Sequence, residues 1–206
     1  MRRPDILNRG FSGCTSQLAL DVLPKFFPVS SQANVQILTV FFGANDACLP
    51  GSAQHVPIDK YTACMKGIVQ HELVRRQWTR VVLIILAPVD KCRLSKNERT
   101  AANTKCYADA CRQVGQELKL LMVGLWSVFM KQAGWDGGSK LIGSKGCERS
   151  EVLGELLSDG LHFVAKPYSI MLRELMKVMY EELPEQTPDH MPIVFSAWSF
   201  LLEDDR

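Results

Sequence analysis

Residues 35–46 read VQILTVFFGAND, an apolar run that stops at Gly43 and is followed by Asn45 and Asp46. The run is short, rich in β-branched residues and almost free of polar side chains. This pattern predicts a strand buried on both faces, as in a parallel sheet. Open α/β sheets bind their ligands at the carboxyl ends of such strands. We therefore expect Asn45 and Asp46 to lie where the chemistry takes place.

Strands and helices are expected to alternate on both sides of this run. The strands are predicted at 35–42, 81–87 and 120–126, with the tail of a further strand at 5–7. The helices are predicted at 16–27, 59–77, 98–118, 127–133 and 166–182, and 134–150 reads as a glycine- and serine-rich loop, a possible lid or insertion. Such alternation predicts an α/β fold, a three-layer α/β/α sandwich with a parallel sheet.

The chain is expected to form one domain over residues 1–183, with a C-terminal tail over 184–206. A length of 206 residues is enough for one domain with a substantial core. The tail is first proline-rich and then aromatic, and we expect Phe195, Trp198 and Phe200 to pack back on the domain.

Composition excludes several classes of function. The formal net charge is only +2, which gives no reason to expect a nucleic-acid partner. The seven cysteines include no CxxC pair, and Cys106 and Cys111 lack a second ligand pair, so neither a zinc site nor another cofactor is expected. Free buried thiols indicate a reducing, cytoplasmic setting. We expect neither a secretory signal in the first residues nor a membrane span, because every apolar run is too short.

The pair Asp159 and His162 carries the most chemistry. A carboxylate three residues before a histidine can accept from one ring nitrogen and leave the other free as a general base. The alternative is that Asp159 caps a turn and His162 is an ordinary surface histidine. Asn45 can donate to an oxyanion, or it can merely end a strand by bonding local backbone. The backbone N–H of Gly10 can donate to the same oxygen, or Gly10 can be a plain turn glycine.

Three blocks in this order resemble the SGNH (GDSL-type) hydrolase family. They are residues 8–13, NRGFSG, residues 42–46, FGAND, and residues 158–162, SDGLH. Over residues 3–180 the likeness is greatest to the isoamyl acetate-hydrolysing esterases of that family. The resemblance implies a flavodoxin-like sandwich and a carboxylic ester hydrolase that acts on small short-chain acyl esters, such as acetate esters.

The resemblance also implies roles for single residues. Gly10, through its backbone, and Asn45, through its side chain, correspond to the oxyanion hole. His162 corresponds to the base and Asp159 to the acid that orients it. The nucleophilic serine of the family lies in a Gly-Asp-Ser block after its first strand, and no Gly-Asp-Ser occurs in these 206 residues.

The missing block leaves the function open between two hypotheses. Ser12, Cys14 and Cys48 lie near the expected site, but each reads better as a structural residue, and residues 10–14 miss the Gly-x-Ser-x-Gly pattern. One hypothesis is an esterase whose serine and first strand are absent because the sequence is a truncated product or incomplete gene model. The other is an inactive fragment or non-catalytic relative that serves as a binding module. Without that central strand, we expect the chain to be marginally stable. The oligomeric state is left open.

Overall fold

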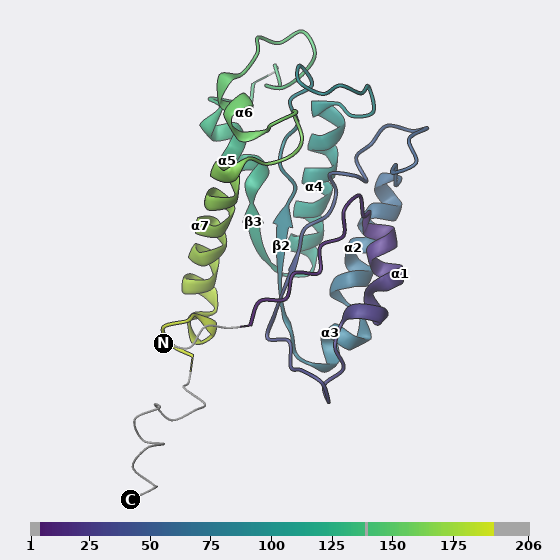
Figure 1. The fold of residues 1–206 in the computed structure, drawn as a ribbon, viewed down its shortest axis with the longest axis vertical. Helices are drawn as coiled ribbons and strands as arrows, with labels where there is room; N and C mark the ends of the chain where they lie inside the picture. Colours follow the sequence, from purple (N-terminus) through teal and green to yellow (C-terminus); the bar gives the residue numbers. More distant parts are fainter. Residues whose placement is uncertain (1–4, 139, 192–206) are drawn as a thin grey trace, which may run out of the picture.

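The computed structural model describes residues 5–138 and 140–191, and its centre is a parallel three-stranded sheet. The strands are β1 (Ile37–Val40), β2 (Arg80–Ile85) and β3 (Leu121–Gly124), in the order β1-β2-β3. Leu38 is paired with Val81, and Val82 with Leu121. The parallel sheet expected from the buried apolar runs is confirmed, and all three carboxyl ends lie at one edge (Figure 1).

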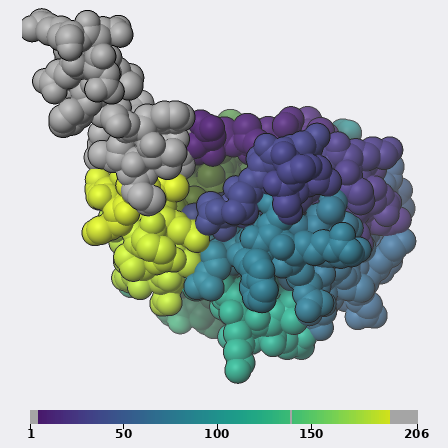
Figure 2. Space-filling view, turned by 90° about the horizontal axis from the view of Figure 1, so that it is seen from below, coloured from purple at the N-terminus to yellow at the C-terminus, as the bar shows by residue number. Residues whose placement is uncertain are grey.

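Helices cover both faces of the sheet, which confirms the three-layer sandwich (Figure 1). The helices are α1 (Ser16–Phe26), α2 (Ile58–Val69), α3 (Glu72–Arg76), α4 (Ala101–Glu117), α5 (Leu125–Gln132), α6 (Glu151–Leu156) and α7 (Ala165–Glu182), with a final 3₁₀ turn, η1 (Pro184–Gln186). Helices α1, α2 and α4 form one layer, and α7 packs on β3 in the other. Figure 2, seen from below, shows the yellow end of α7 on a different flank from the purple to blue N-terminal quarter.

The side chains of β2 divide the interior into two cores. Val81, Leu83 and Ile85 belong to the core beneath α1, α2 and α4. Val82 and Ile84 point the other way, into the core with α5 and α7. Because successive strand residues face opposite sides of a sheet, a strand between two helix layers must be apolar at every position. This requirement explains the unbroken apolar run.

Several element boundaries differ from the predictions for local reasons. The helix expected at 59–77 is split into α2 and α3, because the backbone of His71 is not helical, with a ψ of 141°, and its side chain accepts from the N–H of Leu73 at 3.3 Å. The helix expected from residue 98 begins at Ala101, because the Thr100 hydroxyl caps it by accepting from the N–H of Asn103. The third strand ends at Gly124 rather than 126, and α5 begins directly afterwards. Helix α6 was not expected.

The strand tail expected at residues 5–7 is wrong. These residues form no strand, and Ile6 and Leu7 are 86% and 62% exposed. A short strand needs a neighbour to satisfy its N–H and C=O groups, and within the described residues β1 pairs with β2 alone. The aromatic residues of the tail, Phe195, Trp198 and Phe200, lie outside the described residues, and the boundary at 183/184 stays a prediction. Within residues 5–138 and 140–191, no helix is both long and apolar enough to span a membrane.

Candidate active site

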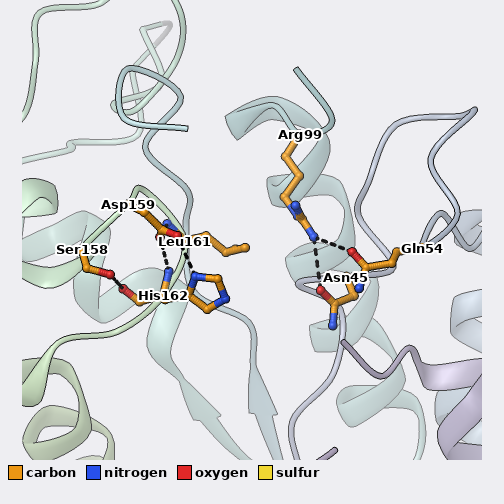
Figure 3. Close-up of polar contacts among 7 residues, drawn as sticks. All are labelled: Asn45, Gln54, Arg99, Ser158, Asp159, Leu161 and His162. Atoms are coloured by element: carbon orange, nitrogen blue, oxygen red, sulfur yellow. Dashed lines mark hydrogen bonds and ion pairs between the residues drawn. The ribbon is translucent and has the colours of Figure 1, made fainter. Parts of the chain in front are cut away.

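The polar blocks singled out in the sequence lie on loops at the carboxyl edge of the sheet. Asn45 and Asp46 follow β1, Asp90 follows β2, and the loop with Asp159 and His162 leads into α7. Figure 3 shows the His162 imidazole on the side of its loop that faces Asn45 and Arg99. The Asn45 block and the Asp159–His162 block therefore lie on loops at the same edge of the sheet, and their convergence on one pocket stays a prediction.

Asp159 and His162 make direct contact. The Nδ1 atom of His162 lies 2.7 Å from Oδ2 of Asp159 (Figure 3). The other carboxylate oxygen, Oδ1, accepts from the backbone N–H groups of His162 at 2.9 Å and Leu161 at 3.0 Å. These hydrogen bonds, that from the His162 backbone foremost, lower the pKa of Asp159 to about 2. The ionised carboxylate can only accept, so it holds the proton of the imidazole on Nδ1.

The loop that carries this pair is closed by its own backbone. The Ser158 N–H and hydroxyl both donate to the His162 carbonyl oxygen, at 2.9 and 3.2 Å. Gly160 has a φ of +88°, and a Cβ there would lie 2.4 Å from the Asp90 carbonyl oxygen. In turn, the N–H of Asp90 donates to the Gly160 carbonyl at 2.9 Å. The loop is thus fixed against the segment that follows β2, which sets where the imidazole is held.

The side-chain amide of Asn45 is oriented by two partners. Its Nδ2 donates to the Cys14 carbonyl at 2.9 Å, and its Oδ1 accepts from the Arg99 guanidinium at 3.2 Å. An amide nitrogen carries two hydrogens, so one N–H of Asn45 is left for a ligand after the bond to Cys14.

The backbone N–H of Gly10, unlike the amide of Asn45, has no hydrogen left for a ligand. Its N–H donates to Oδ1 of Asn8 at 2.9 Å, and the residue is exposed. Across the described chain, no hydrogen bond joins Gly10 to Asn45 or to His162. The donor expected of Gly10 is therefore occupied by a neighbouring side chain here, and its oxyanion role stays a prediction.

Asp46 anchors the turn after β1 to the start of α1. It is fully buried, and its Oδ1 accepts from the backbone N–H and the hydroxyl of Ser16, at 2.9 and 2.5 Å. Its Oδ2 has no hydrogen-bond partner among the residues described. Burial raises the pKa of this carboxyl above its ordinary value, and the Ser16 bonds oppose the rise only in part. Asp46 therefore acts as structural support for Asn45.

Ser12, Cys14 and Cys48 were considered as replacements for the missing serine, but none of them has the surroundings of a nucleophile. Cys14 and Cys48 are buried, and burial raises the pKa of the Cys14 thiol, which opposes thiolate formation. Ser12 is exposed and makes no hydrogen bond to His162. Over the described residues, the Nε2 atom of His162 has no hydrogen-bond partner, and no group of three or more His, Cys, Asp or Glu side chains is arranged to hold a metal.

Sequence reasoning missed three residues that support the site: Gln54, Asp90 and Arg99. Arg99 comes just before the helix cap Thr100, where the helix dipole disfavours a cation, so its position was an unusual signal. Asp90 follows a buried strand, as Asn45 does, and the same reasoning could have found it. Gln54 donates to the Gly13 carbonyl at 3.0 Å, and nothing in the sequence marks it.

Comparison with known proteins gives consistent matches. Residues 1–165 match the GDSL-like Lipase/Acylhydrolase family. An isoamyl acetate-hydrolyzing esterase of Saccharomyces cerevisiae is 31% identical, with 98% of this chain and 80% of that protein covered. A GDSL esterase/lipase of Arabidopsis thaliana is 30% identical over 97% of this chain and 81% of its own length. The isoamyl acetate-hydrolyzing esterase 1 homolog of Homo sapiens is 27% identical, with coverages of 98% and 77%.

Solved structures show the same fold. A lipase/acylhydrolase from Enterococcus faecalis has a TM-score of 0.60 at 20% identity, over 82% of this chain and 72% of that one. An acetylxylan esterase from Geobacillus stearothermophilus has a TM-score of 0.62 at 17% identity, over 84% and 71%. At such identities the likeness establishes the architecture alone.

Proposed function

Because the chain belongs to the GDSL-like lipase/acylhydrolase family, we propose that it is a carboxylic ester hydrolase acting on short-chain acyl esters, acetate esters among them. The contact of 2.7 Å between Asp159 and His162 is the observation that carries the proposal. It gives an imidazole whose Nδ1 faces a carboxylate and whose Nε2 has no hydrogen-bond partner among the described residues, at the carboxyl edge of a parallel sheet. The relatives named for isoamyl acetate hydrolysis support the choice of small ester substrates.

In the proposed reaction His162 acts as general base and then as general acid. Its Nε2 takes the proton of a serine hydroxyl as the serine oxygen attacks the ester carbonyl. The free N–H of the Asn45 amide, together with the N–H of Gly10 once it is released from Asn8, donates to the oxyanion that forms. His162 then protonates the departing alkoxide, and water cleaves the acyl-enzyme by the reverse proton path. Asp159 stays ionised and stabilises the imidazolium.

The serine is the component that the described site does not supply. The 206 residues contain no Gly-Asp-Ser block, so the proposed reaction takes its nucleophile from a segment that they do not include. A second candidate, a non-catalytic binding module, is favoured by one observation: no described hydroxyl or thiol is hydrogen-bonded to Nε2 of His162. In that case the same edge would bind a small ester or carboxylate without turnover.

Labelling with a fluorophosphonate probe, alongside hydrolysis of isoamyl acetate, tests these proposals. We expect the 206-residue chain to show neither stoichiometric labelling nor turnover above background. A form carrying a Gly-Asp-Ser segment should label at that serine and hydrolyse the ester, and His162→Ala should abolish both. If the serine-bearing form folds but stays inert, the binding module is supported instead. Labelling of Ser12 in the 206-residue chain, lost in His162→Ala, would identify a different nucleophile.

A further inference from the structure

Arg99 is a buried cation that contacts the turn after β1 with three hydrogen bonds. It is 8% exposed, and its Nε donates to the Ala44 carbonyl at 2.9 Å. One terminal nitrogen donates both to Oδ1 of Asn45 at 3.2 Å and to Oε1 of Gln54 at 3.3 Å (Figure 3). The guanidinium thus reaches the backbone just before Asn45 and the amide of Asn45 itself.

The acceptors around Arg99 are all neutral. Among the ion pairs of the described residues, none includes Arg99. Burying a cation costs free energy that an adjacent carboxylate would normally offset. Here no carboxylate of the described residues lies within ion-pair distance of the guanidinium, so the nearest partners of its positive charge are neutral acceptors, at the edge where a negative charge would develop on the substrate. A site arranged in this way favours an anion near the Asn45 amide.

The chemistry of a guanidinium also fixes how the Asn45 amide is turned. Arginine can only donate, so the Asn45 atom that faces it must be the carbonyl oxygen. The Nδ2 group must then point the other way, toward the Cys14 carbonyl and the open side of the turn. Donation from a cation to Oδ1 polarises the amide and makes its N–H groups stronger donors.

We propose that Arg99 is a positioning residue for Asn45, which holds the amide with Nδ2 toward the ligand and strengthens it as an oxyanion donor. The inference rests on the proposed function, since Asn45 has an oxyanion to bind only in an acyl-transfer site. Arg99 acts through Asn45 rather than on the substrate.

Nuclear magnetic resonance of the 206-residue protein labelled with [¹⁵N]asparagine tests the proposal without requiring turnover. The side-chain signals of Asn45 are assigned by their loss in Asn45→Ala. The side-chain amide of Asn103, which donates to the Ala47 carbonyl at 2.8 Å, serves as an internal reference in the same sample. The variants are Arg99→Ala and Arg99→Lys, and Arg112→Ala is the control because it removes a guanidinium of α4 that pairs with Asp109.

In Arg99→Ala the amide loses the partner of its Oδ1, so the bond from Nδ2 to the Cys14 carbonyl is no longer held in one orientation. We expect water exchange of the Nδ2 hydrogen in that bond to rise about tenfold. Asn103 should be unchanged. Arg99→Lys keeps the charge but not the paired geometry, so its effect should be intermediate, and Arg112→Ala should resemble the wild type. Unchanged Asn45 exchange, or an equal rise at Asn45 and Asn103, overturns the proposal. If Arg99→Ala does not fold, Arg99→Lys decides by the same criterion.

Titration with methylphosphonate, a tetrahedral anion, separates this inference from the proposed function. We expect the anion to shift the Asn45 Nδ2 signals of the wild type, with about tenfold weaker binding in Arg99→Ala. If the wild-type signals do not move, the oxyanion assignment of Asn45 is overturned. Whether Arg99 holds Asn45 is then still decided by the exchange rates alone.

Discussion

The Nδ1 atom of His162 lies 2.7 Å from Oδ2 of Asp159, while Oδ1 of the same carboxylate accepts the backbone N–H of His162. One aspartate therefore hydrogen-bonds both the ring and the main chain of the histidine. This double contact links the conformation of the loop to the protonation of the ring, because the same carboxylate sets both.

Asp159→Asn is expected to change the tautomer of His162. The carboxylate accepts only, so neutral His162 in the wild type carries its proton on Nδ1. An asparagine side chain can turn its NH₂ group to the ring, and Nε2–H then becomes the preferred form. The ¹⁵N shifts of the imidazole report the change directly. His55, whose Nδ1 lies 2.6 Å from the Cys48 carbonyl, is the internal control and should be unaffected. Retention of the Nδ1–H form in Asp159→Asn would contradict the role given to the carboxylate.

The carboxyl of Asp159 should titrate at about pH 2, because hydrogen bonds from His162 lower its pKa from the ordinary 3.8. A lowered folded-state pKa gives stability that is present above the unfolded value and is lost as the pH falls toward 2. The effect on the unfolding free energy should be small, because the side chain is half exposed. The Asp159 ¹³Cγ shift measures the titration, and thermal melts of wild type and Asp159→Asn at pH 2–5 measure the linkage. A titration midpoint of Asp159 near pH 4 would show that folding does not lower the pKa of this carboxyl.

Gly160→Ala is expected to displace the loop that holds the Asp159–His162 pair. The position has a φ of +88°, and the added Cβ would lie 2.4 Å from a backbone oxygen. We expect a loss of about 1–3 kcal/mol in unfolding free energy from the strained backbone, with the clash adding to it. Gly137→Ala is the matched control, since its φ is +90° and nothing lies within 4 Å of its Cβ. Chemical denaturation and the His162 ring signals should show a larger change for Gly160→Ala, and equal effects would argue against the clash.

Asp46→Asn should alter the pH dependence of stability in the opposite direction to Asp159→Asn. Burial raises the pKa of Asp46, so its contribution to stability is fully present below the unfolded value and is lost as the pH rises through the folded one. The wild type should therefore lose unfolding free energy relative to Asp46→Asn between pH 3 and pH 7. Denaturant titrations at both pH values measure the difference. If the two proteins differ in unfolding free energy by the same amount at pH 3 and pH 7, the pKa of Asp46 is not raised by folding.

Adding an N-terminal strand and a Gly-Asp-Ser block should raise both stability and esterase activity. The strand would pair with the edge of β1 that is unpaired among the described residues, and the serine would come within hydrogen-bond reach of His162, about 2.6–3.2 Å. In that form His162→Ala should abolish turnover, and Asn45→Ala should lower it about 10²–10³-fold, the usual effect of removing one oxyanion donor. Melting curves and ester hydrolysis of both forms give the answer. If the 206-residue form melts cooperatively at the same temperature, the missing-strand argument fails.

The parts of the fold that sequence predicted are those that depend on local pattern. The run at 81–87 is apolar without a break and that at 35–42 is interrupted only by Gln36 and Thr39, so both could be read as buried strands before any partner was known. Asp159 and His162 are only three residues apart, and their contact follows from spacing within one loop. Asn45 could be placed because it directly follows a strand.

The parts that escaped prediction depend on contacts between distant segments. Arg99 meets Asn45 across 54 residues of chain, and no local pattern records that meeting. Residues 5–7 have the composition of a strand, but strand formation requires a neighbour that the described residues do not provide. Helix α6 spans only residues Glu151–Leu156, which is too short to show helical periodicity.

The alternation of β2 side chains between two cores restricts how this sequence can vary. A larger or smaller side chain at Leu83 changes the packing against the helices of one layer. It also shifts β2 itself, and with it Val82 and Ile84, which pack in the core of the other layer. A tolerated substitution in β2 must therefore suit two independent sets of neighbours at the same time. Helix α1 faces only one core and meets a single set. Over many generations the sequence of β2 should consequently change more slowly than that of α1.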